Sequence, residues 1–322
     1  MTAPDCSIVI RAYNEEKHLG RLLSGIERQV GVRAETILVD SGSTDQTVAI
    51  ASQFPVTVLS ISPSEFTFGR SLNLGCSKAH GEFIVLASAH VYPVYPDWLQ
   101  RLLEPFQDQR VALTYGKQRG SRSTRFSEQQ VFAKLFPEHP PPRVEHPFCN
   151  NANAAIRREL WMQRAYDEDL PGLEDLEWGA WATAQGRQLN YVPEAEVIHV
   201  HDEAPRQVYN RYKREAIALK RIWPTERFSL AEFIKLYLSN VANDARQARR
   251  QGVFVRELAG ILWFRWMQFW GTYRGFGHRG PLTTELKRAL YYPQQRRPDR
   301  SVRPREVTPL EYGRALGDPP ES

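Results

Sequence analysis

The first half of the chain alternates short apolar runs with longer amphipathic segments, the pattern of βα units around a mostly parallel sheet. Nearly continuous aliphatic residues predict strands buried on both faces at "CSIVIRAY" and "ETILVD". Three further segments, "VTVLSIS", "GEFIVLAS" and "VALTYGKQRG", also predict strands. The pattern therefore predicts an α/β fold.

Helices are predicted between these strands. In "NEEKHLGRLLSGIERQ", Asn14 is the expected N-cap, and two glutamates suit the positive end of the helix dipole. "STDQTVAIASQF" predicts a helix capped by Ser43 or Thr44, and "GRSLNLGCSKAH" predicts another. The proline-rich "FPEHPPPRVEHPFCNN" predicts a loop.

The character of the chain changes near His201, after which it is helical, basic and aromatic. The last segment is rich in Pro and Arg and predicts a poorly ordered tail. We therefore expect an α/β domain over 1–205 with halves 1–92 and 93–205, a helical extension over 206–292, and the tail over 293–322.

Composition narrows the class. The chain has 322 residues and three scattered cysteines, which favour neither a disulfide framework nor a cysteine zinc site. The N-terminus lacks a secretory pattern, and the longest apolar stretch, Leu258 to Trp270, contains Arg265 and is shorter than a membrane span. We expect a cytoplasmic protein, and the net charge of +5 favours an anionic partner.

Polar residues follow the first two predicted strands, and an open α/β sheet binds ligands at the carboxyl ends of its strands. Arg11, Tyr13 and Glu15 follow the first strand, while Asp40 and Ser41 follow the second. The glycine-bearing turn after Asp40 allows close approach of a ligand. The alternative is that this turn merely caps a helix.

Five motifs in order, "SIVIRAYNEEKHLGRLL", "ILVDSGSTDQT", "FGRSLNLGCSKAHGEFIVL", "CNNANAAIRRELW" and "GLEDLEWGAWATAQG", resemble the family 2 glycosyltransferases. The resemblance covers about the first two thirds of the chain. It implies the GT-A fold, with a nucleotide-binding half, an acceptor-binding half, and inversion at the anomeric carbon. It also implies a nucleotide-sugar donor.

The resemblance also implies roles for single residues. The nucleotide-binding positions are Arg11 (where the family commonly has proline), Ala12, Tyr13, Glu15, Asp40, Ser41, Arg70, Ser88 and Ala89. Asn150, Asn151 and Asn153 fall where the family meets donor sugar or acceptor, although amides also satisfy irregular backbone. Trp178 either stacks on a sugar or packs its helix.

An inverting transfer needs one carboxylate to deprotonate the attacking hydroxyl. "LEDLEW" matches the family motif in which the aspartate is the base, so we assign that role to Asp175. Glu174 then binds the acceptor hydroxyl or orients the base. Without the resemblance, a preference of acidic residues for helix N-termini would account for both.

The metal motif is altered. Most family members have Asp-x-Asp where this chain has Ser88, Ala89 and His90. Related GT-A enzymes that glycosylate polypeptides use Asp-x-His with a downstream histidine, and "VIHVHDE" supplies His199 and His201. We favour a divalent cation, Mn or Mg, over direct binding of diphosphate by the histidines or an ordinary polar role for them.

The helical extension combines a basic run with "GILWFRWMQFWGTYRGFG". Such a surface suits a bilayer headgroup layer and a lipid-linked acceptor, while packing or a dimer interface is the alternative. We do not expect nucleic-acid binding. Our hypothesis is an inverting transferase using a UDP-sugar in surface polysaccharide assembly, peripheral at the inner membrane face. The alternatives are a non-catalytic nucleotide-sugar-binding scaffold and, third, a nucleotidyltransferase.

Overall fold

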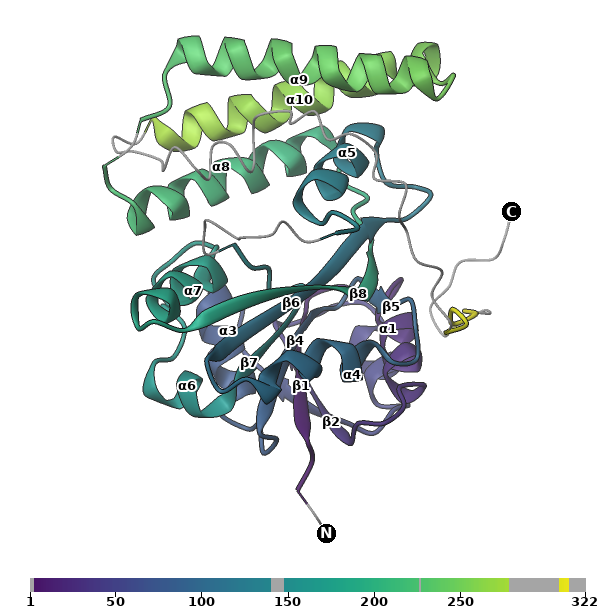
Figure 1. Ribbon diagram of the computed structural model, residues 1–322, viewed down its shortest axis with the longest axis vertical. Coiled ribbons are helices and arrows are strands. Elements are labelled where there is room, and N and C mark those ends of the chain that lie inside the picture. Colours follow the sequence, from purple (N-terminus) through teal and green to yellow (C-terminus); the bar gives the residue numbers. More distant parts are fainter. Residues whose placement is uncertain (1–2, 140–147, 226, 278–306, 313–322) are drawn as a thin grey trace.

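The computed structural model of the chain describes residues 3–139, 148–225, 227–277 and 307–312. An α/β layer lies below a layer of long helices (Figure 1). Among the described residues, eight strands form one sheet in the order β3-β2-β1-β4-β7-β6-β8-β5. The strands are β1 (Cys6–Ala12), β2 (Ala34–Asp40), β3 (Val56–Ser60), β4 (Phe83–Ser88), β5 (Val91–Pro93), β6 (Val111–Gly120), β7 (Asn153–Arg157) and β8 (Gln188–His199).

Six of these strands point the same way, and only β7 and β5 run antiparallel to their neighbours. The mostly parallel sheet predicted from the apolar runs is therefore confirmed. The helices are α1 (Leu19–Glu27), α2 (Thr47–Ala51), α3 (Phe68–Cys76), α4 (Trp98–Leu103), α5 (Phe126–Leu135), α6 (Arg158–Gln163), α7 (Glu174–Ala184), α8 (Pro205–Ile222), α9 (Leu230–Arg250) and α10 (Phe254–Phe276).

Alternation along β1 builds a core on each face of the sheet. Ile8 and Ile10 belong to a buried cluster with Leu22 of α1 and Trp98 of α4. Val9, between them, belongs to the opposite cluster, which includes residues of α3 and α7. Successive side chains of a strand point to opposite faces, so an apolar run with no polar interruption requires helices on both sides.

Two predicted helix starts are wrong. Helix α1 begins at Leu19, and Asn14 lies five residues earlier with φ +56°, so it does not cap the helix. Its side-chain oxygen accepts a hydrogen bond from the Thr44 backbone N–H at 2.8 Å, and its own N–H donates to the Ser43 hydroxyl at 2.9 Å. Ser43 and Thr44 thus join the turn after β2 to the turn after β1 instead of capping α2.

Residues 307–312 lie against the sheet. Residues 307–312 of the predicted tail are described, and the Leu310 N–H donates to the Val94 carbonyl at 2.8 Å, next to β5. The Tyr312 ring lies 5.6 Å from that of Tyr92. The other residues of the 293–322 prediction lie outside the described residues.

The helical layer packs tightly on itself. A Cβ atom added at Gly271 would lie 2.5 Å from the Tyr209 carbonyl oxygen, and one at Gly275 would lie 2.5 Å from that of Lys213. These two glycines therefore let α10 approach α8 closely. No helix among the described residues is long and apolar enough to cross a membrane.

A buried ion pair ties α5, α9 and α10 together. The Arg265 guanidinium donates to both Asp244 carboxylate oxygens, at 2.7 and 3.0 Å, and to the Ser127 carbonyl at 3.2 Å. The Ser127 hydroxyl donates to the same carboxylate at 2.6 Å. Asp244 is fully buried and Arg265 is nearly so.

Replacing Asp244 with Asn should lower the free energy of unfolding by about 3–5 kcal/mol, because the Arg265 charge stays buried without its partner. Chemical denaturation measures this loss. Glu257→Gln is the control, because Glu257 pairs with the exposed Arg256 on the same helix and should matter far less. Equal stability losses for the two variants would contradict a structural role for the buried pair.

Candidate active site

A cavity of about 790 Å³ lies at the carboxyl ends of β1, β4 and β8, between the sheet and α8. This volume is in the range of small-molecule sites. All five sequence-predicted catalytic and metal-binding residues line it. The predicted residues that line it are Arg11, Glu15, Ser88, His90, Asn150, Asn151, Glu174, Asp175, His199 and His201.

Left-handed backbone occurs at this cavity. Among the described residues, the non-glycine positions with positive φ are Asn14 (φ +56°) and Leu173 (φ +59°), and both line it. Leu173 is the N-cap of α7, so its backbone conformation sets the direction in which the chain enters the helix at Glu174 and Asp175. Such strain costs about 1–3 kcal/mol and concentrates at functional sites.

Hydrogen bonds fix both carboxylates of the Glu174–Asp175 pair. The Arg11 guanidinium donates to Glu174 Oε1 at 3.2 Å, and the Asn151 amide donates to the same oxygen at 3.4 Å. Asp175 accepts from the backbone N–H groups of Asn151 and Leu176, each at 2.8 Å. Glu174 is thus neutralised by a cation, whereas Asp175 is held only by neutral donors.

Burial, and then the nearby negative charge of Glu174, together raise the pKa of Asp175 to about 7, although the two backbone N–H groups and Arg11 oppose the shift. A carboxylate with this pKa can take up a proton from a substrate hydroxyl near neutral pH and hold it. The geometry and the titration both suit a general base.

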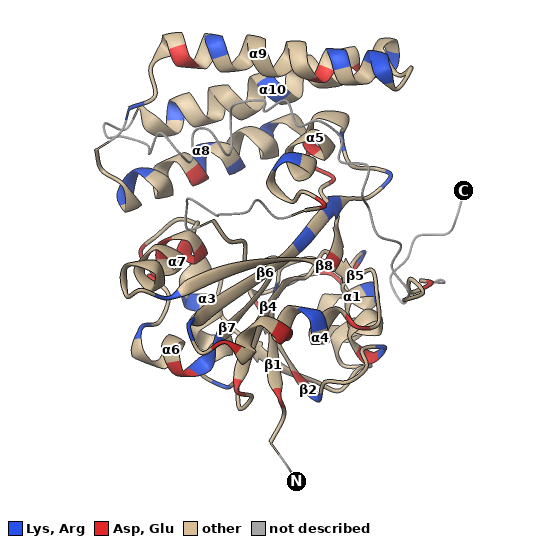
Figure 2. Ribbon diagram, in the orientation of Figure 1, with Lys and Arg blue, Asp and Glu red and all other residues tan. Residues whose placement is uncertain are grey.

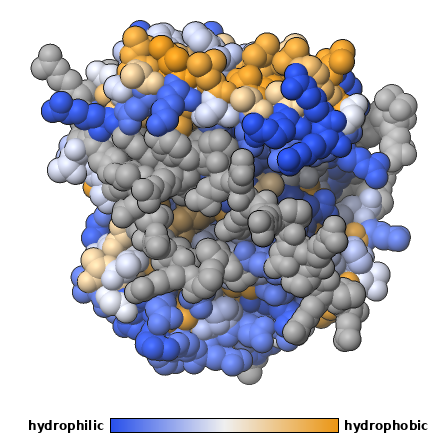
Figure 3. Space-filling view, turned by 45° about the horizontal axis from the view of Figure 1, so that its top comes forward, coloured by the Kyte–Doolittle hydropathy of each residue, from blue (hydrophilic) through white to orange (hydrophobic). Residues whose placement is uncertain are grey.

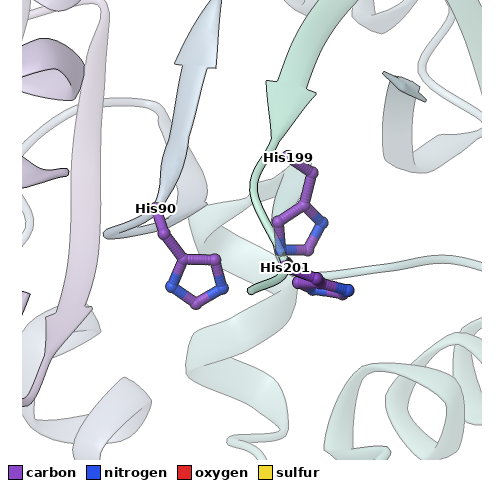
Figure 4. A group of neighbouring side chains, drawn as sticks. All are labelled: His90, His199 and His201. Atoms are coloured by element: carbon purple, nitrogen blue, oxygen red, sulfur yellow. Dashed lines mark hydrogen bonds between the residues drawn. The ribbon is translucent and has the colours of Figure 1, made fainter. Parts of the chain in front are cut away.

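Three imidazoles from different parts of the chain lie together (Figure 4). His90 lies between β4 and β5, His199 ends β8, and His201 follows two residues later. The His90 and His199 ring centres are 5.0 Å apart, and the Nε2 atoms of His199 and His201 are 2.9 Å apart. One nitrogen of each ring lies within 4.8 Å of those of the other two.

The outer nitrogen of each ring faces an oxygen. Nδ1 of His90 lies 2.8 Å from Glu15 Oε1, Nδ1 of His199 lies 2.7 Å from Gln118 Oε1, and Nδ1 of His201 lies 2.7 Å from Glu128 Oε1. In the tautomer that carries its proton on Nδ1, each ring donates to its oxygen and each Nε2 presents a lone pair.

This arrangement fits a cation. Two nitrogens bound at about 2.1 Å and at right angles to each other lie about 3.0 Å apart, close to the separation of the His199 and His201 Nε2 atoms. Burial lowers the pKa values of both His199 and His201, which favours the neutral form that binds metal. The three residues could therefore hold a divalent ion.

Several predicted nucleotide contacts lie away from the cavity lining. The Asp40 carboxylate accepts from the Gly42 and Ser43 N–H groups of its own turn, and Ser41 is buried beside it. Arg70 is half exposed and pairs with Glu65. Ala12 and Ala89 are buried in the core, and Tyr13 is largely exposed.

The structure also places two predicted sugar-binding residues in the core. Asn153 is fully buried, and its amide donates to the Lys117 and Ala195 carbonyls at 3.2 and 2.8 Å. Trp178 is fully buried as well, with its indole donating to the Arg164 carbonyl at 2.8 Å. Neither side chain lines the cavity, whereas Asn150 and Asn151 do.

Sequence reasoning missed important cavity and supporting residues. Glu128 and Gln118 orient the histidines, but no motif marks them, and α5, which carries Glu128, was not predicted. Arg211 and Arg214 belong to the basic run of the helical extension, which predicts a surface, yet both line the cavity. The Arg214 Nε is buried without a hydrogen-bond partner in the described structure, and its guanidinium lies 4.6 Å from the Phe68 ring centre.

The sequence of this chain is similar to those of known glycosyltransferases. Residues 7–163 match the model of Glycosyl transferase family 2. The O-antigen chain rhamnosyltransferase WbaN of Salmonella anatum is 26% identical over 222 residues, which cover 65% of this chain and 70% of that protein. RfbN of Salmonella typhimurium strain LT2, also an O-antigen chain rhamnosyltransferase, is 25% identical over 64% of this chain and 69% of its own.

Solved structures match the fold. The mannosyltransferase PcManGT of Pyrobaculum calidifontis, in complex with GDP-Man and Mn²⁺, superposes with a TM-score of 0.56 at 18% identity, covering 86% of this chain and 85% of that one. Glucosyl-3-phosphoglycerate synthase of Mycobacterium tuberculosis gives 0.51 at 19% identity, covering 68% and 80%. Residues 7–163 are thus identified as a family 2 glycosyl transferase domain, and these two solved structures agree with it in fold.

Proposed function

We propose that this protein transfers a sugar from a nucleotide-diphosphate donor to a glycan or lipid-linked acceptor, with inversion, during the assembly of a surface polysaccharide. The observation that carries the proposal is that Asp175 and the three histidines line one cavity. The rhamnosyltransferase relatives make a rhamnose donor a strong candidate beside the UDP-sugar expected from the sequence.

Asp175 acts as the general base in this mechanism. The acceptor hydroxyl approaches the face of the sugar opposite the diphosphate and gives its proton to the Asp175 carboxylate. Arg11 holds Glu174 beside it, so Glu174 keeps the pKa of Asp175 high without itself being exposed to the solvent. One base suffices for inversion, because no covalent sugar intermediate needs to form.

His90, His199 and His201 would hold a divalent cation, which supplies positive charge to the departing diphosphate. Mn²⁺ is bound in PcManGT, which has the same fold. Glu15, Gln118 and Glu128 orient the three rings from their Nδ1 sides. Manganese and magnesium are both candidates.

The acceptor side of the cavity suits an anionic group. Arg214 reaches the cavity from α8, and its buried Nε has no hydrogen-bond partner among the described residues. A guanidinium of this kind favours a phosphate, because it offers several donors in one plane. A lipid-linked diphosphate acceptor at the cytoplasmic face of a membrane has this chemistry.

Replacing Asp175 with Asn should lower kcat about 1,000-fold, because asparagine cannot accept the hydroxyl proton. Released nucleotide, measured across a panel of nucleotide sugars with acceptor extract, reports turnover, and donor affinity should change little. Asp169→Asn, at an exposed position in the segment that precedes α7, is the matched control. An Asp175→Asn enzyme as fast as wild type would remove the base assignment, and donor binding without turnover in any pairing would favour a non-catalytic scaffold.

The pH profile should show the same group. The pKa of Asp175 is raised to about 7, so at a pH below this value Asp175 is protonated and cannot act as a base. The value of kcat/KM should therefore rise as the pH increases through about 7. Glu174→Gln should shift this limb to lower pH, because it removes a negative charge that raises the pKa of Asp175. A limb that stays in place in this variant would show that another group controls it.

Metal dependence is tested on binding as well as on turnover. EDTA should abolish activity and Mn²⁺ should restore it, and His199→Ala should weaken Mn²⁺ binding by about 100-fold or more. Electron paramagnetic resonance measures the free ion in the absence of donor. His80→Ala, an exposed histidine paired with Glu35, is the control. Turnover unaffected by EDTA would exclude the metal while leaving the transferase intact.

A further inference from the structure

The outer surface of α9 and α10 is apolar. On α9, Leu230, Ile234 and Leu238 recur every four residues, which places them on one side of the helix. On α10, Leu262 and Trp266 are also exposed, and all five side chains are between 39% and 58% accessible. We name these five residues the α9–α10 face. Figure 3 shows its hydrophobic surface as an orange band at the top of the molecule, bordered by hydrophilic side chains.

Aromatic rings lie along the same two helices. The Phe233 ring contacts those of Trp266, Trp270 and Tyr273, with centres 5.3, 5.7 and 6.1 Å apart. Tyr237 lies edge-on to Trp266 at 5.5 Å. Trp and Tyr side chains are enriched where protein meets the headgroup region of a bilayer, because they combine an apolar ring with a polar atom.

Charge along the chain is divided between the layers. Residues 1–204 contain nineteen Lys and Arg against twenty-six Asp and Glu, whereas residues 205–277 contain fourteen against five. The α/β part therefore has a net charge of −7 and the long helices have +9. Figure 2 shows Lys and Arg on all three long helices, and exposed examples include Arg246, Arg249, Arg250, Arg256 and Arg274.

We propose that the α9–α10 face binds the surface of an anionic bilayer, lying in the headgroup layer without crossing it. Apolar side chains enter the acyl boundary, and the arginines around them contact lipid phosphates. The proposal deepens the proposed function, because it brings the cavity to a lipid-linked acceptor. The α9–α10 face is connected to the cavity through α8. Helix α10 packs on α8, and α8 carries Arg211 and Arg214 into the cavity.

A second copy of the chain is the competing occupant. Residues 230–277, which hold α9 and α10, contain seven Lys and Arg against three Asp and Glu. Pairing two such faces would therefore bring two regions of net charge +4 together, which opposes association. A bilayer containing phosphatidylglycerol offers apolar contact and negative charge together. Charge complementarity therefore favours lipid over self-association.

Liposome flotation of the full chain tests the proposal. We expect the protein to float with vesicles containing phosphatidylglycerol, to bind neutral phosphatidylcholine vesicles weakly, and to dissociate partly at high salt. The double variant Ile234→Asp, Leu238→Asp should lower the partition coefficient by about tenfold or more, because it places charge in the apolar contact. Met162→Asp is the matched control, since Met162 is exposed on α6, which lies in the α/β layer.

Turnover with a short acceptor lacking the lipid separates this proposal from the proposed function. The double variant should keep that turnover and its melting temperature, while losing flotation. Wild type that does not float with anionic vesicles, or a double variant that floats as well as wild type, would overturn the proposal. A dimer seen by light scattering that the double variant dissociates, without any flotation of wild type, would assign the face to a second copy instead.

Discussion

The candidate site depends on one repeated contact, in which an oxygen atom lies at the Nδ1 side of each of three imidazoles. Glu15 comes from the loop after β1, Gln118 from β6 and Glu128 from α5. Each contact fixes a ring and directs its Nε2 toward the others. Segments separated by more than one hundred residues must therefore fold together before the cluster exists.

The same contact joins the helical layer to the sheet. Arg211 of α8 donates to Glu128 Oε1 at 2.6 Å and also contacts Glu203. Burial raises the pKa of Glu128, but the charge of Arg211 and the hydrogen bond from His201 outweigh burial and bring it to about 2. Glu128 thus stays ionised at any physiological pH. The long helices are therefore part of the site's electrostatics and not only an addition to the α/β domain.

Sequence patterns predicted the elements whose burial is uniform. Strands β1, β2, β4 and β6 lie near their predicted bounds because apolar runs covered on both faces have no other stable arrangement, and the partly buried edge strand β3 also lies near its predicted bounds. Helix α5 was missed because it carries buried polar residues such as Ser127 and Glu128, whose partners come from distant helices. The start of α1 was misplaced for a similar reason, since Asn14 bonds to the turn after β2 and no local pattern records that contact.

The residues of the candidate site also fall into those that the sequence located and those that it did not. Sequence motifs located Asp175 and the histidines, because spacing along the chain carries that information. They did not show that Asn153 and Trp178 are buried, or that Arg214 reaches the cavity, because those facts depend on how the layers pack. Motifs therefore indicated several residues that line the cavity, but the same motifs also pointed to Asn153 and Trp178, whose burial depends on tertiary contacts.

Replacement of the usual acidic pair by Ser88 and His90 raises a question of charge. Three neutral imidazoles bring no negative charge to a divalent ion, unlike two carboxylates. In this chain the charge lies one step further out, on Glu15 and Glu128, each of which accepts from a histidine Nδ1. A proton shared along such a contact makes the ring more basic and moves part of the carboxylate charge toward Nε2. A divalent ion bound here would draw charge mainly from Glu15 behind His90, because Arg211 already pairs with Glu128 and with Glu203.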